Sequence, residues 1–132
     1  ILITGPRRAG KSTLSKKLLE LWGYGDLEQR YFSFDTPDAV SRFQEDPVIF
    51  MRNLKTPCVL DEVQNVPDIF RYIKSDLDKS FSKKIKYILT GSQQFNMMKG
   101  VSESLAGRIL IKELSPFSQA EIRETSVNKR ET

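Results

Sequence analysis

Short apolar segments alternate along the chain with longer segments in which apolar residues recur at helical spacing. The first longer segment runs from Lys11 to about Trp22 and stops at Gly23, which predicts an amphipathic helix ended by glycine. Its apolar stripe consists of Leu14, Leu18, Leu21 and Trp22. The short apolar segments predict five strands, at Ile1–Thr4, Tyr31–Asp35, Cys58–Leu60, Ile85–Thr90 and Arg108–Leu114.

Capping signals and apolar spacing predict further helices. Thr36-Pro37 and Asp46-Pro47 each place a capping side chain before a proline, the residue favoured at the first helical position. Apolar residues also recur at helical spacing from Pro67 to about Leu77. Because strands and helices alternate along the chain, we predict an α/β fold. Its parallel sheet is covered by helices on both faces, and its crossovers are right-handed.

The composition fits a single globular domain. The chain has 132 residues, of which 39% are hydrophobic and 29% charged, as in ordinary folded proteins. There are 21 basic and 17 acidic residues, so the formal charge is +4. The basic clusters at Lys16-Lys17 and Lys83-Lys84 are too short for the dense stripe that nucleic-acid binding needs. We therefore do not predict a nucleic-acid partner for this chain.

Two residue counts exclude several kinds of chemistry. The chain has no histidine and one cysteine, Cys58, which excludes catalytic triads with histidine, Cys-His pairs, internal disulfides and zinc sites with the usual ligands. No apolar run reaches the ~18 residues of a membrane span, so we expect no membrane partner. The absence of disulfides makes the cytoplasm the expected location. The chain opens without methionine and ends in a polar tail, Ser126–Thr132, so we expect a longer parent protein.

The main chemical signal lies between the first strand and its helix. Gly5 to Ser12 reads G-P-R-R-A-G-K-S, which matches the phosphate-binding pattern G-x-x-x-x-G-K-[ST]. In such a loop, backbone N–H groups and a helix N-terminus surround phosphate, the lysine reaches the β- and γ-phosphates, and the hydroxyl binds Mg²⁺. The predicted nucleotide-binding residues are Gly5, Pro6, Arg7, Arg8, Ala9, Gly10, Lys11, Ser12 and Thr13.

Two acidic residues follow the third predicted strand. In an open parallel sheet, ligands bind at the carboxyl ends of the strands, which is where Asp61 and Glu62 stand. We predict that Asp61, with Ser12, holds Mg²⁺ and that Glu62 is the base that polarises the attacking water. The structural alternative for both is a solvated loop carboxylate.

A small polar segment ends the fourth strand, at Thr90-Gly91-Ser92. If this strand lies between the first and third, Ser92 or Thr90 faces the γ-phosphate; we favour Ser92 as the sensor over a simple cap. Gln64 either orients the attacking water, links nucleotide state to a partner, or is an ordinary loop amide. Arg108 is either an arginine finger or a salt-bridged arginine.

These motifs together resemble the AAA+ superfamily of P-loop ATPases. The narrower likeness is to prokaryotic AAA-domain ATPases with a C-terminal nuclease-like domain, and it rests also on Ser104–Arg108, Leu114–Ser118 and Glu121. The resemblance implies a three-layer α/β/α fold whose five-stranded sheet has the order 5-1-4-3-2. It puts Lys11, Ser12, Asp61 and Glu62 at Walker A and Walker B positions and Ser92 at sensor 1. It also implies ATP as the nucleotide.

The predicted function is therefore Mg²⁺-dependent ATP hydrolysis by an AAA+-type core that spans residues 1–132 and lacks the family's lid and C-terminal domain. Glu62, Lys11 and Ser92 are its predicted catalytic residues. The alternative is a nucleotide-gated binding or switch module with little hydrolysis. Beyond ATP, we expect a protein partner that the sequence does not identify, and the resemblance makes a homo-oligomer possible.

Overall fold

A parallel β-sheet forms the centre of the molecule in the computed structural model, which describes residues 1–6, 10–79, 85–92, 95–105 and 110–113. Its strands are β1 (Leu2–Thr4), β2 (Tyr31–Ser33), β3 (Cys58–Asp61), β4 (Tyr87–Gly91) and β5 (Ile111–Glu113). Every pairing is parallel, and the order is β2-β3-β4-β1-β5, which reads 5-1-4-3-2 from the other edge. The predicted α/β class with a parallel sheet is confirmed.

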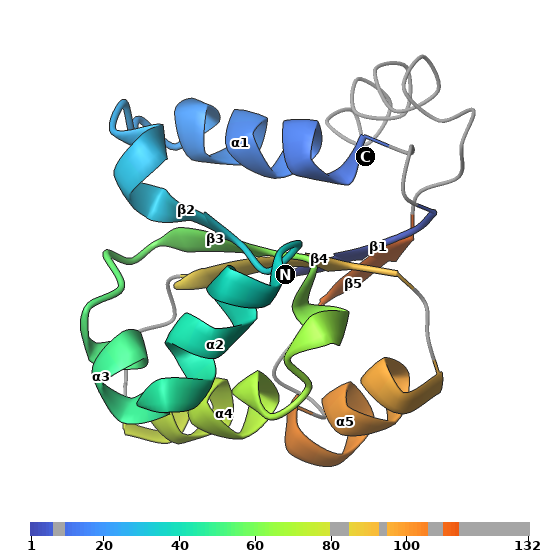
Figure 1. The fold of residues 1–132 in the computed structure, drawn as a ribbon. Coiled ribbons are helices and arrows are strands. Elements are labelled where there is room, and N and C mark those ends of the chain that lie inside the picture. Colours follow the sequence, from blue (N-terminus) through green and yellow to red (C-terminus); the bar gives the residue numbers. More distant parts are fainter. Residues whose placement is uncertain (7–9, 80–84, 93–94, 106–109, 114–132) are drawn as a thin grey trace.

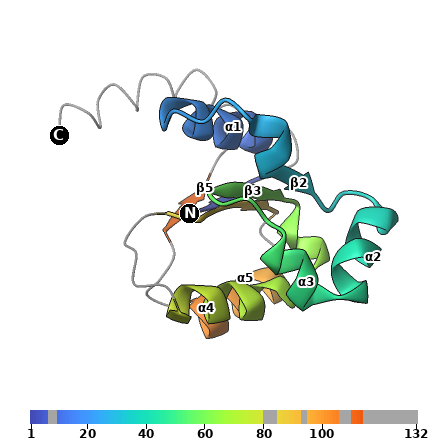
Figure 2. The same ribbon diagram turned by 90° about the vertical axis from the view of Figure 1, so that its left-hand side faces the viewer.

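The helices cover the two faces unequally (Figure 1). Helix α1 (Lys11–Leu21) lies on one face, and α2 (Pro37–Glu45), α3 (Pro47–Arg52), α4 (Ile69–Lys79) and α5 (Phe95–Leu105) lie on the other. The view turned by 90° shows the same three layers (Figure 2). Two short 3-10 turns, η1 (Leu27–Arg30) and η2 (Val63–Asn65), precede β2 and α4. None of the described helices is long and apolar enough to cross a membrane.

Both predicted capping signals are confirmed. The side chain of Thr36 accepts a hydrogen bond from the backbone N–H of Ala39 at 3.2 Å, and α2 begins at the proline that follows it. The side chain of Asp46 does the same for Ile49 at 3.1 Å, at the start of α3. Each cap satisfies a backbone donor that the first turn of a helix leaves unpaired.

Alternating strand residues supply two separate cores. Leu2, Leu60 and Leu89 are neighbours across β1, β4 and β3 and point toward α4 and α5, where they join the larger cluster. On the other face, Ile3, Val59 and Ile88 pack with Leu19 of α1 in a smaller cluster; the register pairs Val59 with Ile88. This alternation gives each face its own apolar layer.

The predicted apolar stripe of α1 is only partly correct. Leu14 and Leu18 are partly buried against the smaller cluster, but Leu21 is 69% exposed and Trp22 is 39% exposed. The residues of α1 that are fully buried are instead Lys11, Ser15 and Leu19, which are four positions apart and share one face of the helix. Helix α1 is therefore rotated so that a lysine and a serine, not only leucines, face the sheet.

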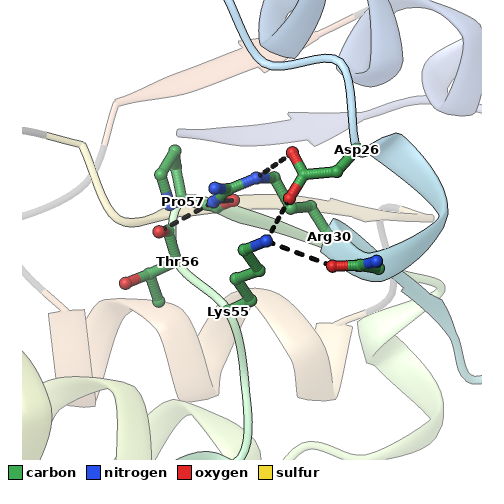
Figure 3. Close-up of polar contacts among 6 residues, drawn as sticks. Asp26, Arg30, Lys55, Thr56 and Pro57 are labelled. Carbon is green, nitrogen blue, oxygen red and sulfur yellow. Dashed lines mark hydrogen bonds and ion pairs between the residues drawn. The ribbon is translucent and has the colours of Figure 1, made fainter.

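Arg30 fixes the start of β2 against the segment that leads into β3 (Figure 3). Its guanidinium donates to Asp26 at 2.7 Å and to the carbonyl oxygens of Thr56 at 2.8 Å and Pro57 at 3.2 Å. Lys55 forms a second ion pair with Asp26. Because Arg30 is buried, these contacts set the position of the residue that follows it, the first residue of β2.

Candidate functional site

The carboxyl ends of three neighbouring strands, β1, β4 and β3, lie side by side and form one edge of the sheet. Strand β4 lies between β1 and β3, so Gly5, Glu62 and Ser92, which follow β1, β3 and β4, come together there. The backbone N–H of Gly5 donates to the carbonyl of Gly91 at 3.3 Å, which extends the β1–β4 pairing past the strand. Ligands of open parallel sheets bind outside these carboxyl ends.

Gly5 and Lys11, near the two ends of the predicted phosphate-loop sequence, lie at this edge of the sheet, and Gly10 makes the turn into α1. Gly10 has φ 83° and ψ 23°, a left-handed conformation in which a side chain would be strained. The buried Lys11 folds back, and its Nζ donates to the carbonyl of Gly5 at 2.7 Å. Burial lowers the pKa of Lys11, while the charges of Glu62 and Asp61 act in the opposite direction. Three predicted loop residues, Arg7, Arg8 and Ala9, lie outside the described residues.

Asp61 accepts hydrogen bonds from four hydroxyl groups. Its Oδ1 receives Ser12 Oγ at 2.9 Å and the hydroxyl of Thr90. Its Oδ2 receives Tyr31 OH at 2.8 Å and Ser33 Oγ at 3.0 Å. The carboxyl group is buried, so these four donors replace the water that would otherwise solvate it.

Tyr31 and Ser33 are site residues that the sequence analysis missed. They stand two positions apart in β2, so both side chains point to the face of α1. The register pairs Ser33 with Asp61. Burial raises the pKa of Tyr31 to about 12, with the hydrogen bond to Asp61 acting in the same direction, so the phenol remains a donor at neutral pH. The signal was the polar residue at every second position of β2, but only the β2–β3 register connects it to Asp61.

Glu62 is held by its backbone and by Gln64. Its φ of 59° and ψ of 46° put a residue with a side chain in the left-handed region, which costs ~1–3 kcal/mol. The backbone N–H of Glu62 donates to Thr90 Oγ1 at 3.1 Å. Gln64 Nε2 donates to Glu62 Oε2 at 2.6 Å, and Gln64 Oε1 accepts from the N–H of Ser92 at 3.3 Å. Gln64 thus connects the ends of β3 and β4.

A pocket of about 290 Å³ opens in front of these groups. It is lined by Lys11, Asp35, Glu62, Gln64, Asn65 and Ser92. The hydroxyl of Ser92 is buried and has no hydrogen-bond partner in the part of the chain that the structure describes. The hydroxyl of Thr90 is used between Asp61 and the N–H of Glu62. Of the two sensor candidates, Ser92 therefore lines the pocket and has a hydroxyl without a partner among the described residues, whereas the Thr90 hydroxyl is already used. The arginine-finger candidate, Arg108, lies outside the described residues.

The pair of Ser12 and Asp61 fits a cation that keeps most of its water. Ser12 and Asp61 offer one hydroxyl and one carboxylate in direct contact. The described residues contain no cluster of three acidic, cysteine or histidine side chains that would enclose a metal by themselves. Mg²⁺ is commonly held in this way, by one or two protein oxygens, several waters and substrate phosphates.

A family model for the AAA domain matches residues 1–123. The chain belongs to the AAA domain family. At this level the match identifies an AAA-type P-loop ATPase domain, and nucleotide binding is its general property.

The AAA domain is also similar to two uncharacterized mycobacterial proteins. Mb2031c of Mycobacterium bovis and Rv2008c of Mycobacterium tuberculosis are each 28% identical to it over 129 residues. The match covers 98% of this chain but only 28% of either relative. The AAA domain therefore spans somewhat more than a quarter of the length of these curated relatives.

Proposed function

We propose that this AAA domain binds ATP with Mg²⁺ and hydrolyses the bond between the β- and γ-phosphates. The observation that carries the proposal is the meeting of Lys11, Ser12, Asp61 and Glu62 at one edge of the sheet, with Ser12 Oγ 2.9 Å from Asp61 Oδ1. They form two pairs in the sequence, Lys11-Ser12 and Asp61-Glu62, which lie 49 or more positions apart. The strand order β1–β4–β3 brings the two pairs together.

In this proposal the loop binds the phosphates, and the ammonium group of Lys11 offsets their negative charge. Backbone N–H groups at the start of α1 point toward the carboxyl edge of the sheet, where a helix N-terminus favours an anion. Lys11 Nζ moves from the carbonyl of Gly5 to phosphate oxygen, which is a stronger acceptor for an ammonium group. Ser12 and Asp61 hold Mg²⁺, which neutralises phosphate charge when it is bound.

Glu62 accepts the proton of the attacking water. The chain has no histidine, and the other carboxylate at the end of β3, Asp61, already accepts four hydrogen bonds. Glu62 accepts one from Gln64 in the described structure, and its side chain lines the pocket. Ser92 lines the same pocket, and in this proposal its hydroxyl, which has no partner among the described residues, contacts the γ-phosphate.

The test measures ATP binding and ATP turnover separately. Lys11→Ala abolishes binding of Mg-ATP in a calorimetric titration, while the control Lys17→Ala, on the exposed side of the same helix, leaves it unchanged. Glu62→Gln retains binding and lowers turnover by ~10²-fold or more, in the range expected for removal of a general base. Glu20→Gln, an exposed glutamate of α1, is the matched control. Equal turnover in the wild type and Glu62→Gln contradicts the hydrolase.

A nucleotide-gated switch is the second candidate, and the Gln64 contact favours it. Gln64 holds the Glu62 carboxylate and the Ser92 backbone at once, so a change at the γ-phosphate site is passed directly to the end of β3. In a switch, Mg-ATP and Mg-ADP bind with different affinities, while turnover does not depend on Glu62. The same Glu62→Gln measurement therefore separates the two functions.

A further inference from the structure

We propose that Tyr31 is a positioning residue that orients the Asp61 carboxylate and so sets the Mg²⁺ requirement of nucleotide binding. This inference rests on the proposed function. It concerns a residue of β2, outside the loop and the strand ends that carry the nucleotide-binding motifs.

The two oxygens of Asp61 are held from different elements. Oδ1 is held by Ser12 of α1 and Thr90 of β4, beside the phosphate loop. Oδ2 is held by Tyr31 at 2.8 Å and by Ser33 at 3.0 Å, both from β2. The β2 donors therefore hold Oδ2 in place and leave Oδ1 facing Ser12, the other proposed cation ligand.

The phenol of Tyr31 is itself held in place. Its backbone follows the buried Arg30, which is bonded to Asp26 and to two carbonyl groups before β3. The ammonium group of Lys16 lies 4.3 Å from the centroid of the tyrosine ring. The tyrosine side chain is thus held from two elements, by Lys16 of α1 at its ring and by Asp61 of β3 at its hydroxyl.

Hydrogen-bond partners of a ligating carboxylate have a known effect on metal affinity. They fix the orientation of the ligand, and their loss typically weakens metal binding by ~10- to 100-fold. Without the phenol, Ser33 is the remaining donor on Oδ2, and the Asp61 side chain turns more freely about its last torsion. Tyr31→Phe keeps the ring and removes only the oxygen that contacts Asp61.

The experiment is a titration of ATP binding against Mg²⁺ concentration. We expect Tyr31→Phe to raise the half-maximal Mg²⁺ concentration ~10-fold, with ATP affinity in EDTA nearly unchanged. The melting temperature of the metal-free protein falls, because one hydrogen bond to the buried Asp61 carboxylate is lost, so binding is compared at a temperature where both proteins are folded. Ser33→Ala, which removes the second donor to Oδ2, shifts the Mg²⁺ requirement in the same direction. Tyr24→Phe is the matched control, because Tyr24 stacks on Arg30 away from Asp61.

Three other results overturn the inference. An unchanged Mg²⁺ requirement in Tyr31→Phe, in a background where the wild type binds Mg-ATP, removes the role of Tyr31 and leaves the proposed function intact. Tighter Mg²⁺ binding means that the phenol competes with the cation for Asp61, the opposite of positioning. A wild type that binds no Mg-ATP under any condition overturns the proposed function and this inference together.

Discussion

Replacing Asp61 by asparagine is expected to destabilise the protein even in the absence of any nucleotide or metal. The substitution keeps the shape of the side chain and removes its charge and one of its two acceptor oxygens. In the folded protein four hydroxyl groups, those of Ser12, Tyr31, Ser33 and Thr90, point at this carboxylate. After the change, two of them face an amide N–H₂ group and have to rotate to accept from it.

The magnitude follows from the difference between charged and neutral hydrogen bonds. A bond to a charged group contributes about 1.5–3 kcal/mol and a bond between neutral groups about 0.5–1.5 kcal/mol, so four weakened bonds amount to roughly 4 kcal/mol. Burial of the carboxylate, which is 5% exposed, has a desolvation cost that the neutral amide largely avoids. With that gain subtracted, we expect a net loss of about 2 kcal/mol, or roughly 6–10 °C in melting temperature for a chain of this size.

The assay is urea unfolding of the wild type, Asp61→Asn and Glu62→Gln in EDTA without nucleotide, so that ligand binding adds nothing to stability. Glu62→Gln is the matched control, because it makes the same chemical change one residue along the chain. Glu62 accepts one hydrogen bond, from Gln64, and should lose under about 1 kcal/mol. An Asp61→Asn loss no larger than that of Glu62→Gln would refute the argument that the four hydroxyls stabilise the charged carboxylate.

Three further predictions concern the rest of the fold. Phe43→Ala removes a buried ring that packs edge-on against Phe50 and should cost about 3–5 kcal/mol in urea unfolding. The hydrogen bond from Lys55, with that from Arg30, lowers the pKa of Asp26 from 3.8 to about 2, so its stabilisation is complete above pH 3.8 and is lost as the pH falls toward 2. Acid unfolding of Asp26→Asn should lack that component. Burial raises the pKa of Cys58 to about 12, so a thiol reagent at pH 8 should react only as urea unfolds the protein.

The elements of this fold were predictable because its local signals are strong. Helices α2 and α3 begin at the prolines that follow their capping residues, as predicted, and every described strand overlaps its predicted segment. The rotation of α1 was not predictable from apolar spacing. Apolar spacing counts Lys11 and Ser15 as polar residues and therefore predicts that they are exposed. Both are buried, because they lie on the face of α1 that packs against the sheet.

The motif residues of the site were predictable, and their supporting groups were not. Lys11, Ser12, Asp61 and Glu62 lie together because their motifs follow β1 and β3, whose separation by β4 is a property of the sheet. The binding roles of these residues stay predictions. Tyr31 belongs to no motif, and its contact with Asp61 depends on a register between strands 28 residues or more apart in the sequence, which local patterns do not encode.

The two faces of the sheet divide stability and chemistry between them. On the face of α2 to α5, the aromatic rings of Phe32, Phe34, Phe43, Phe50 and Tyr72 form one connected cluster. On the face of α1, the apolar cluster is small, because the carboxyl ends of the strands there carry hydroxyl and carboxylate groups instead. A backbone hydrogen bond links the aromatic cluster to the polar network, because the N–H of Phe34 donates to the carbonyl of Asp61 at 2.9 Å. The aromatic cluster thus stabilises the strand end that carries the polar network. The network itself orders the site but buries little apolar surface.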